Sequence, residues 1–247
     1  VALNSPGMRG EALWHGTYLS NVRMAFLGEK IPGTLFWSLA VEEQFYLVWP
    51  WIILWVPRRR LLAVLVAVVC VAPIYRALGH ELGLNIFALR FLPFGCLDTL
   101  GAGSLLGYVW HDRGPESPAL RRLSAAFLGV GLPLFLLGLL LPNHVLGLAL
   151  GNLGDGLFFG WIVSRAARAG GRPSVLGNRA VMYVGTISYG IYVLHPFVQG
   201  VVVHYGLDAF LPPPARPVLW FCAVLLVATC SWRFYERPIG RLKRFLS

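Results

Sequence analysis

The chain has 247 residues, of which 57% are hydrophobic and only 13% are charged. Soluble domains carry roughly 25% charged residues, so this composition excludes an ordinary soluble protein and predicts a membrane protein. The net charge of +10 does not indicate nucleic-acid binding, because the basic residues form short clusters between apolar segments, as they do where they set membrane topology. The cysteines lie singly in apolar segments without metal-ligand spacing, so we expect no metal site.

Residues 1–33 come before the first long apolar run, and we expect them to form a loop outside the membrane. Their aromatic residues Trp14, Tyr18 and Phe26 are spaced by four and eight residues, as on a helix that lies at the membrane interface. The chain opens at Val1 without an initiator methionine or a signal peptide, so we also expect earlier spans to be absent from this sequence.

Seven apolar runs predict seven membrane-spanning helices, because about 20 apolar residues cross the hydrocarbon core of a bilayer. We therefore expect an all-α, polytopic transmembrane helix bundle. A single domain would cover residues 1–247, with the bundle over 34–234 and a basic cytoplasmic tail over 235–247. The predicted spans lie near residues 34–56, 61–79, 86–110, 123–142, 145–165, 181–205 and 218–234.

The basic residues predict which side of the membrane each loop faces. With residues 1–33 outside, alternating crossings place 15 of the 21 Lys and Arg residues on one side. Basic loops face the cytoplasm, so this side is predicted to be cytoplasmic. The chain would then lie in the plasma (inner) membrane with its N-terminus external and its C-terminus cytoplasmic.

The first predicted span carries two adjacent carboxylates, Glu42 and Glu43, inside an aromatic run. A charge at membrane depth costs at least about 2.5 kcal/mol, so such residues are kept where the protein satisfies or uses them. Successive helical residues point about 100° apart, so the two acids face different directions, while Tyr46 can reach either. Pro50 leaves the Tyr46 carbonyl without its helical hydrogen bond. We expect a polar cavity here; pairing of one glutamate with an arginine from another helix is the alternative.

The third predicted span contains Arg90 and Asp98, two turns apart with Pro93 between them. We do not expect them to touch each other, and each is expected to face a partner on another helix. Arg90 is a candidate for holding a phosphate or carboxylate. A snorkelling arginine near the outer interface is the alternative.

Pairs of glycines spaced four residues apart occur in the third and fifth predicted spans. Small residues at this spacing let two helices approach closely. We therefore expect close helix packing at Gly103 with Gly107, Gly147 with Gly151, and Gly156 with Gly160.

The sixth predicted span carries one polar stripe on an otherwise apolar helix, formed by Ser188, Tyr192, His195 and Gln199. His195 precedes Pro196, which leaves the Tyr192 carbonyl without a helical hydrogen bond. We expect the stripe to face inward and to line a substrate site. A direct catalytic role for His195 and a purely structural one are the alternatives.

Several segments resemble one known family. Residues 36–50 closely resemble the Trp-Ser-Leu-x-x-Glu-Glu-x-Phe-Tyr motif of the acyltransferase-3 family, integral-membrane enzymes that move acyl groups, commonly acetyl, onto hydroxyls of carbohydrates and other acceptors. Residues 13–21 resemble the external loop before that motif, residues 187–196 the penultimate helix, and residues 235–238 the closing motif. The resemblance implies about ten helices with both ends in the cytoplasm, which agrees with seven spans here and three missing ones.

The resemblance also implies which residues form the site. Family members carry a basic residue eleven positions before a histidine on their first helix, and that histidine is regarded as the general base. No histidine here has such a partner, so the motif is not in this sequence. Glu42 or Glu43 would then orient or charge the base, with His195 as a further catalytic candidate. The substrate-binding candidates are Trp37, Ser38, Tyr46, Arg90 and Tyr192.

The sequence thus predicts an O-acyltransferase in the lipid bilayer that moves an acyl group, acetyl first of all, from an acyl-CoA donor in the cytoplasm. The acceptor is a hydroxyl of a carbohydrate or a lipid-linked glycan of the cell envelope; no metal and no nucleic acid take part. A secondary transporter or flippase is an alternative, since kinked helices and intramembrane acids also mark ion paths, but it predicts internal symmetry that we do not find. A truncated, non-catalytic remnant is the other alternative.

Overall fold

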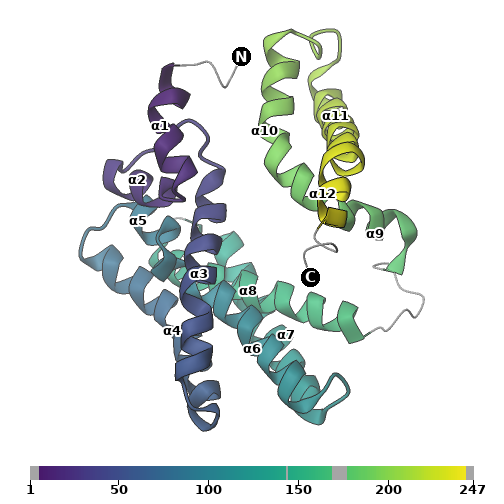
Figure 1. Ribbon diagram of the computed structural model, residues 1–247. Coiled ribbons are helices and arrows are strands. Elements are labelled where there is room, and N and C mark those ends of the chain that lie inside the picture. Colours follow the sequence, from purple (N-terminus) through teal and green to yellow (C-terminus); the bar gives the residue numbers. More distant parts are fainter. Residues whose placement is uncertain (1–5, 143, 169–176, 243–247) are drawn as a thin grey trace. The chain divides into compact units, whose positions relative to one another are not determined.

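The computed structural model describes residues 6–142, 144–168 and 177–242, and every regular element in these ranges is a helix. The predicted all-α class is thereby confirmed. The chain divides into two compact units, drawn in Figure 1 and described separately below: an N-terminal unit (Arg9–Gly170) and a C-terminal unit (Gly171–Ser247 with Val1–Met8). The prediction of one domain over the chain stays a prediction, and residues 1–5 and 243–247 of the expected loop and tail lie outside the described ranges.

The N-terminal unit begins with two short helices where the sequence predicted an external loop. Tyr18 lies between them, so Trp14, Tyr18 and Phe26 do not share one helix. Longer helices follow. In chain order the elements are α1 (Pro6–Gly16, in this unit from Arg9 on), α2 (Ser20–Leu27), α3 (Phe36–Trp55), α4 (Arg58–Glu81), α5 (Ile86–Phe91), η2 (Pro93–Gly95), α6 (Leu97–Arg113), α7 (Pro118–Leu140) and α8 (Val145–Arg168).

The core of this unit lies where α4, α6, α7 and α8 pack together. Its buried side chains are Leu61, Leu65, Ala102, Leu105, Leu106, Leu120, Phe127 and Leu157. Glycines let α7 and α8 come into backbone contact: a Cβ added at Gly154 would lie 2.2 Å from the Phe135 nitrogen. The close packing expected at the other glycines of α8 is confirmed: a Cβ at Gly151 would lie 3.0 Å from Gly138 of α7, and one at Gly156 would lie 2.9 Å from Thr99 of α6. For Gly103 and Gly107 it is wrong, because a Cβ at either position would meet nothing within 4 Å in the described part of the chain.

The segment predicted as one span over 86–110 is broken into α5, η2 and α6. Leu92 is extended, with ψ of 151°, because a residue before a proline avoids the helical region. Gly95 follows two residues after Pro93, and a Cβ there would lie 2.1 Å from the Leu89 carbonyl oxygen. The proline and the tight backbone approach together explain why this segment is not a continuous helix.

The expected count of seven spans is not confirmed. Within the described ranges, four helices are long and apolar enough to cross a membrane, and a fifth span arises if the pair 179–204, bent by 67°, counts as one. The four are Arg58–Glu81, Pro118–Leu140, Val145–Arg168 and Pro213–Arg241. Helix α3 has 20 residues, but its two glutamates and Gln44 lower its mean hydropathy, and α6 has only 17 residues.

Basic residues gather at one end of the N-terminal unit. Arg58 at the start of α4 donates to Asp112 near the end of α6, with 2.6 Å between Nη2 and Oδ1. This hydrogen bond lowers the pKa of the Asp112 carboxyl below its ordinary value. Arg168 at the end of α8 donates to the Ser124 hydroxyl near the start of α7, at 3.2 Å. These contacts join helix ends that the sequence predicted to lie on one side of the membrane. The cytoplasmic location of that side stays a prediction.

The C-terminal unit is built around the packing of α10 on α11. Its elements are α9 (Arg179–Thr186), α10 (Ser188–His204), η4 (Pro213–Ala215), α11 (Arg216–Ser231), the π-helical turn η5 (Trp232–Glu236) and α12 (Arg237–Leu242). Glu236 accepts a hydrogen bond from the Ser231 hydroxyl at 2.9 Å. Its carboxylate lies over Gly190, where a Cβ would come within 3.1 Å of Oε1. A glycine in α10 thus makes room for the glutamate of the closing motif.

Candidate functional site

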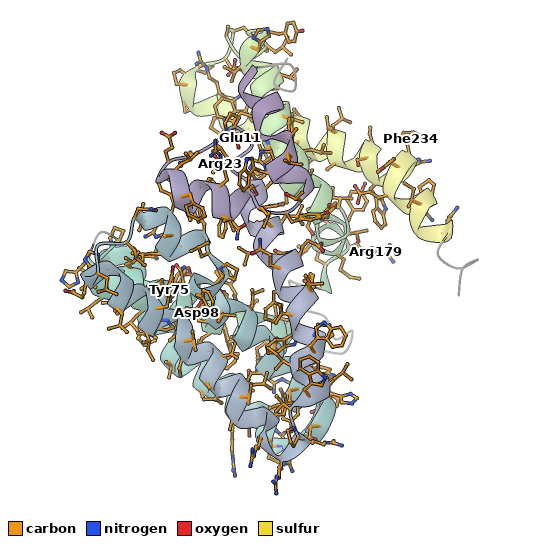
Figure 2. All side chains as sticks on the ribbon, turned by 60° about the vertical axis from the view of Figure 1, so that its left-hand side comes forward. Glu11, Arg23, Tyr75, Asp98, Arg179 and Phe234 are labelled. Carbon is orange, nitrogen blue, oxygen red and sulfur yellow. The ribbon has the colours of Figure 1, made fainter. Side chains whose placement is uncertain are left out.

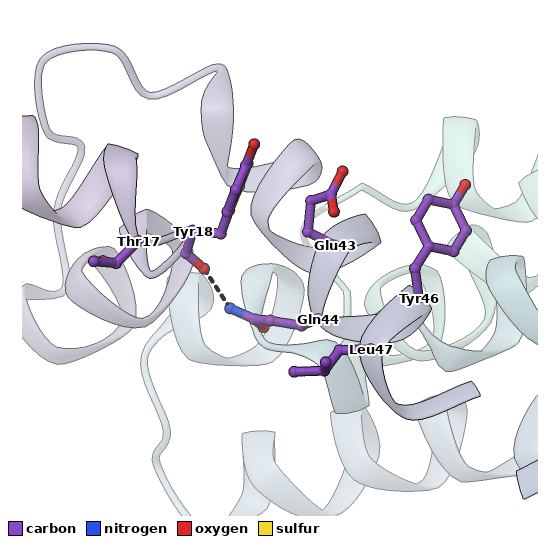
Figure 3. Close-up of a pocket in the computed structure, with 6 residues that line it drawn as sticks. All are labelled: Thr17, Tyr18, Glu43, Gln44, Tyr46 and Leu47. Carbon is purple, nitrogen blue, oxygen red and sulfur yellow. Dashed lines mark hydrogen bonds between the residues drawn. The ribbon is translucent and has the colours of Figure 1, made fainter. Parts of the chain in front are cut away.

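A pocket of about 420 Å³ lies beside α3, at the turn that carries the adjacent glutamates (Figure 3). Residues of α3 and of the segment between α1 and α2 line it: Thr17, Tyr18, Glu43, Gln44, Tyr46 and Leu47. We call it the glutamate pocket. It combines a carboxylate with two phenol rings and a hydroxyl, and such a combination suits a polar ligand that also presents apolar faces.

Hydrogen bonds of Gln44 hold the two sides of this pocket together. Its Nε2 donates to the Tyr18 carbonyl at 2.7 Å, drawn as the dashed line in Figure 3, and to the Asn21 side chain at 3.0 Å. Asn21, which is fully buried, donates back to Gln44 at 3.1 Å and to the Phe91 carbonyl at 3.1 Å. Tyr18 has a φ of 56°, a left-handed conformation that a tyrosine adopts only where its surroundings fix it. The network therefore fixes the backbone beside Glu43.

The two glutamates differ in their surroundings. Glu43 lines the glutamate pocket together with Tyr46, whereas Glu42 points to another side of α3, as the helical spacing predicted. Both are exposed on the surface of the N-terminal unit, and neither forms a hydrogen bond or an ion pair with the residues described. Pairing with an arginine of another helix, the alternative interpretation, is thus not found within the described ranges. Of the two glutamates, Glu43 lines the pocket, and a catalytic role for either stays a prediction.

Trp37 and Ser38, predicted to bind substrate, lie outside the lining of this pocket. The Trp37 ring stacks on Phe91, with 4.3 Å between ring centroids and 18° between planes. Both Trp37 and Ser38 are half-buried. In this unit Trp37 therefore packs α3 against α5, and a role in substrate binding stays a prediction for both residues.

Asp98 has a partner that the sequence reasoning did not identify. Arg76 of α4 donates from Nη2 to the Asp98 carboxylate at 2.5 Å, and both side chains are fully buried. Arg76 also donates to the carbonyls of Gly95, at 2.5 Å, and of Ala149, at 2.7 Å. Figure 2 labels Asp98 among the helices of this unit. One guanidinium thus ties together α4, η2, α6 and α8.

Arg90 does not contact Asp98, as expected. It lines a different pocket, of about 290 Å³, together with His80 and His144. The expectation that Arg90 faces another helix is consistent with this position.

In the C-terminal unit, the His195 side chain replaces the helical hydrogen bond that Pro196 removes from α10. Its Nδ1 lies 2.8 Å from the Tyr192 carbonyl oxygen, the group that loses its helical donor to the proline. A carbonyl only accepts, so Nδ1 carries the proton and, in the neutral ring, Nε2 is left with a free lone pair. The ring centroids of Tyr192 and His195 are 6.3 Å apart. His195 therefore has a structural bond and retains a potential basic nitrogen.

A larger groove, of about 720 Å³, lies at the opposite end of α3. Apolar residues of α3 and α4 form one wall, and α6 contributes Ser104, Tyr108 and His111. Leu54 in this wall is eleven residues after Glu43, which places both on one face of α3 about 16 Å apart along its axis. We call it the basic-end groove, because Arg58 lies at its rim. It opens at the end of the unit where the arginines gather.

The sequence reasoning missed three residues that organise these sites: Asn21, Gln44 and Arg76. Gln44 and Arg76 each gave a signal, a strongly polar residue inside a run predicted to span the membrane. Asn21 gave none, since a polar residue in a loop is ordinary. Among the residues described, no group of three or more His, Cys, Asp or Glu side chains could hold a metal ion.

Comparison with known proteins identifies the family. A family model described as an acyltransferase domain matches residues 10–236. The chain is 26% identical over 255 residues to the peptidoglycan O-acetyltransferase OatA of Listeria monocytogenes, covering 95% of this chain and 40% of that protein. It is 27% identical to YrhL of Bacillus subtilis, covering 94% of this chain and 40% of YrhL. The chain thus spans about 40% of the length of these relatives, and no solved structure matches it. Its apolar helices make it a multi-pass membrane protein, and the match over 10–236 places it in the acyltransferase-3 family.

Proposed function

We propose that this chain forms the membrane part of an O-acetyltransferase that acts on a hydroxyl of a cell-envelope glycan. The acetyl donor is acetyl-CoA from the cytoplasm, and the acceptor is on the external side of the plasma membrane. The family membership and the name of the Listeria relative support the reaction class. The clustering of arginines at one end of the N-terminal unit supports the orientation.

The glutamate pocket is the observation that carries this proposal. In acetyl transfer the acceptor oxygen forms a bond to the thioester carbonyl carbon, the carbon–sulfur bond breaks, and coenzyme A leaves as a thiolate that takes up a proton. The acceptor hydroxyl must lose its own proton as it attacks, so a base must be held beside it. The Glu43 carboxylate is suited to orient such a base, or to accept a hydrogen bond from the hydroxyl itself. Tyr18 and Tyr46 offer rings against which a sugar can pack.

The basic-end groove is suited to the donor. Its walls are mostly apolar, with the Ser104 hydroxyl and the Tyr108 ring among them, which fits a pantetheine arm that carries amides along an aliphatic chain. Arg58 at the rim is paired with Asp112, and the exposed Arg59 and Arg60, next in the chain, offer positive charge for the phosphates of a nucleotide. Because Leu54 and Glu43 share one face of α3, the helix provides a continuous surface from the donor groove to the glutamate pocket.

The test is an acetyl-transfer assay in membranes that contain the natural-length protein, with labelled acetyl-CoA and cell-envelope glycan. Glu43→Gln should lower kcat by about 100-fold or more, the usual contribution of acid–base groups. Glu42→Gln should have a smaller effect, because Glu42 does not line the pocket. Glu29→Gln is the control, since Glu29 is an exposed acid in the loop after α2. If Glu42→Gln and Glu43→Gln both leave turnover unchanged, the assignment fails.

A further inference from the structure

The pocket that Arg90 lines has no role in the proposed acetyl transfer. It lies in the N-terminal unit where α4 ends, α5 runs and α8 begins, and its volume is about 290 Å³. Three basic side chains, His80, Arg90 and His144, share its lining with apolar residues that include Leu89 and Leu148. We call it the basic pocket.

Arg90 provides a positive charge without a counterion. Its Nε is buried and has no hydrogen-bond partner, and its guanidinium forms no ion pair with any residue in the described ranges. A buried donor without a partner is costly, and a charged one more so. Asp98, the acid nearest in the sequence on the C-terminal side, already pairs with Arg76. The protein therefore leaves the Arg90 charge available to a ligand.

The two histidines add hydrogen-bond donors to the same pocket. His144 is the residue before α8, and its Nδ1 accepts the Leu146 N–H at 3.2 Å, in the manner of an N-cap. An accepting Nδ1 carries no proton, so the proton of the neutral ring is on Nε2 and is available to a ligand. His80 lies in the last turn of α4. Glu81, the next residue, is not part of the lining, and none of the lining residues is acidic.

From this arrangement we infer that the basic pocket binds a phosphate group, with Arg90 as the main contact and the histidines as supporting donors. Guanidinium groups match the geometry of phosphate oxygens, and basic pockets between membrane helices bind lipid head groups. The small volume fits a phosphate with a few attached atoms and not a glycan. The apolar lining by Leu89 and Leu148 favours a phosphate that is attached to a lipid chain.

A lipid phosphate has two possible sources, a bulk membrane lipid and the lipid carrier of a glycan. Only the second source rests on the proposed acetyl transfer. A carrier bound here would hold its glycan at the unit that also contains the glutamate pocket. The binding itself requires no acetyl donor. The two proposals can therefore fail separately.

The test measures ligand binding to the purified natural-length protein in neutral detergent by the shift in thermal unfolding. The probes are dioctanoyl phosphatidic acid, dioctanoylglycerol, which lacks the phosphate, and inorganic pyrophosphate. We expect phosphatidic acid to raise the unfolding temperature and dioctanoylglycerol to leave it unchanged. A shift by pyrophosphate alone would identify a free phosphate as sufficient, and a shift by the lipid alone would identify a lipid phosphate.

Variants assign the binding to this pocket. Arg90→Gln should weaken phosphatidic acid binding by about tenfold or more, the usual effect of losing a charged hydrogen-bond partner. His144→Asn, whose side-chain oxygen can still cap α8, should weaken it by about threefold. Arg122→Gln, which removes an exposed charge near the start of α7, is the matched control and should bind as the unchanged protein does.

Two results would overturn the inference. One is equal binding of phosphatidic acid and dioctanoylglycerol. The other is an Arg90→Gln protein that keeps its unfolding temperature without ligand and binds phosphatidic acid as tightly as the Arg122→Gln control. Glu43→Gln should retain phosphate binding while losing acetyl transfer, which separates this site from the proposed catalytic one.

Discussion

Removal of Arg76 should destabilise the N-terminal unit more than any other loss of a single charge described here. Its guanidinium donates to the Asp98 carboxylate at 2.5 Å and to the carbonyls of Gly95 and Ala149, and neither Arg76 nor Asp98 is exposed. In Arg76→Met a methionine fills much of the same volume but donates no hydrogen bond. The Asp98 carboxylate would retain only the Thr99 N–H, at 2.9 Å, and the Thr99 hydroxyl.

The size of the effect follows from these contacts. Breaking a buried ion pair by removing one partner costs about 3–5 kcal/mol, because the remaining charge stays in a low-dielectric interior. Arg76→Met should therefore lower the free energy of unfolding by this amount. Asp98→Leu should cost a similar amount. The double variant removes both charges together, so its cost should fall short of the sum of the two by about 2 kcal/mol.

The assay is unfolding of the purified protein by SDS in mixed micelles, followed by far-UV circular dichroism and tryptophan fluorescence. Arg60→Met, an exposed arginine in the same helix, is the control and should change the free energy of unfolding by less than about 0.5 kcal/mol. The reasoning is refuted if Arg76→Met stays within about 1 kcal/mol of the unchanged protein, or if the two single effects simply add.

Three further predictions concern packing, the histidine of α10 and pH. Gly154→Ala should cost about 1–3 kcal/mol of unfolding free energy, because its Cβ would overlap the α7 backbone, whereas Gly129→Ala, with open space around it, should gain up to about 1 kcal/mol; equal SDS midpoints would contradict this. His195→Asn keeps a donor for the Tyr192 carbonyl but lacks Nε2, so a catalytic role predicts inactivity with normal stability; an active His195→Asn beside an unstable His195→Phe would show a structural role. Arg58→Ala should lower stability at neutral pH, where the lowered pKa keeps Asp112 charged, and the difference should vanish as pH falls through that pKa, below about 4; parallel thermal-unfolding curves across this range would argue against the bond.

Local chemistry made part of this structure predictable. A proline four residues after Tyr192 removes a helical donor, and the sequence alone shows that the Tyr192 carbonyl needs another. The structure supplies it from His195, the residue just before the proline. The different directions of Glu42 and Glu43 follow from the helical repeat in the same way.

Contacts between elements that are distant in sequence were beyond such reasoning. Arg76 and Asp98 are in different helices, and only the packing of α4 on α6 brings them together. The Asn21–Gln44 pair likewise depends on how α2 docks against α3. The break at Pro93 was foreseeable as a kink, but the full interruption depends on Gly95 packing against the Leu89 carbonyl. Helical periodicity fixes directions along one helix and leaves the neighbours undetermined.

The hydrogen bond from Gln44 to residue 18 leaves the proposed acceptor site open to changes in preference. The glutamine holds the main-chain carbonyl of Tyr18 and makes no use of its side chain. The ring at position 18 can therefore be exchanged while the backbone keeps its path beside Glu43. In the proposed acceptor site, preference can change through the side chain at position 18, and the helix that carries the acid stays as it is.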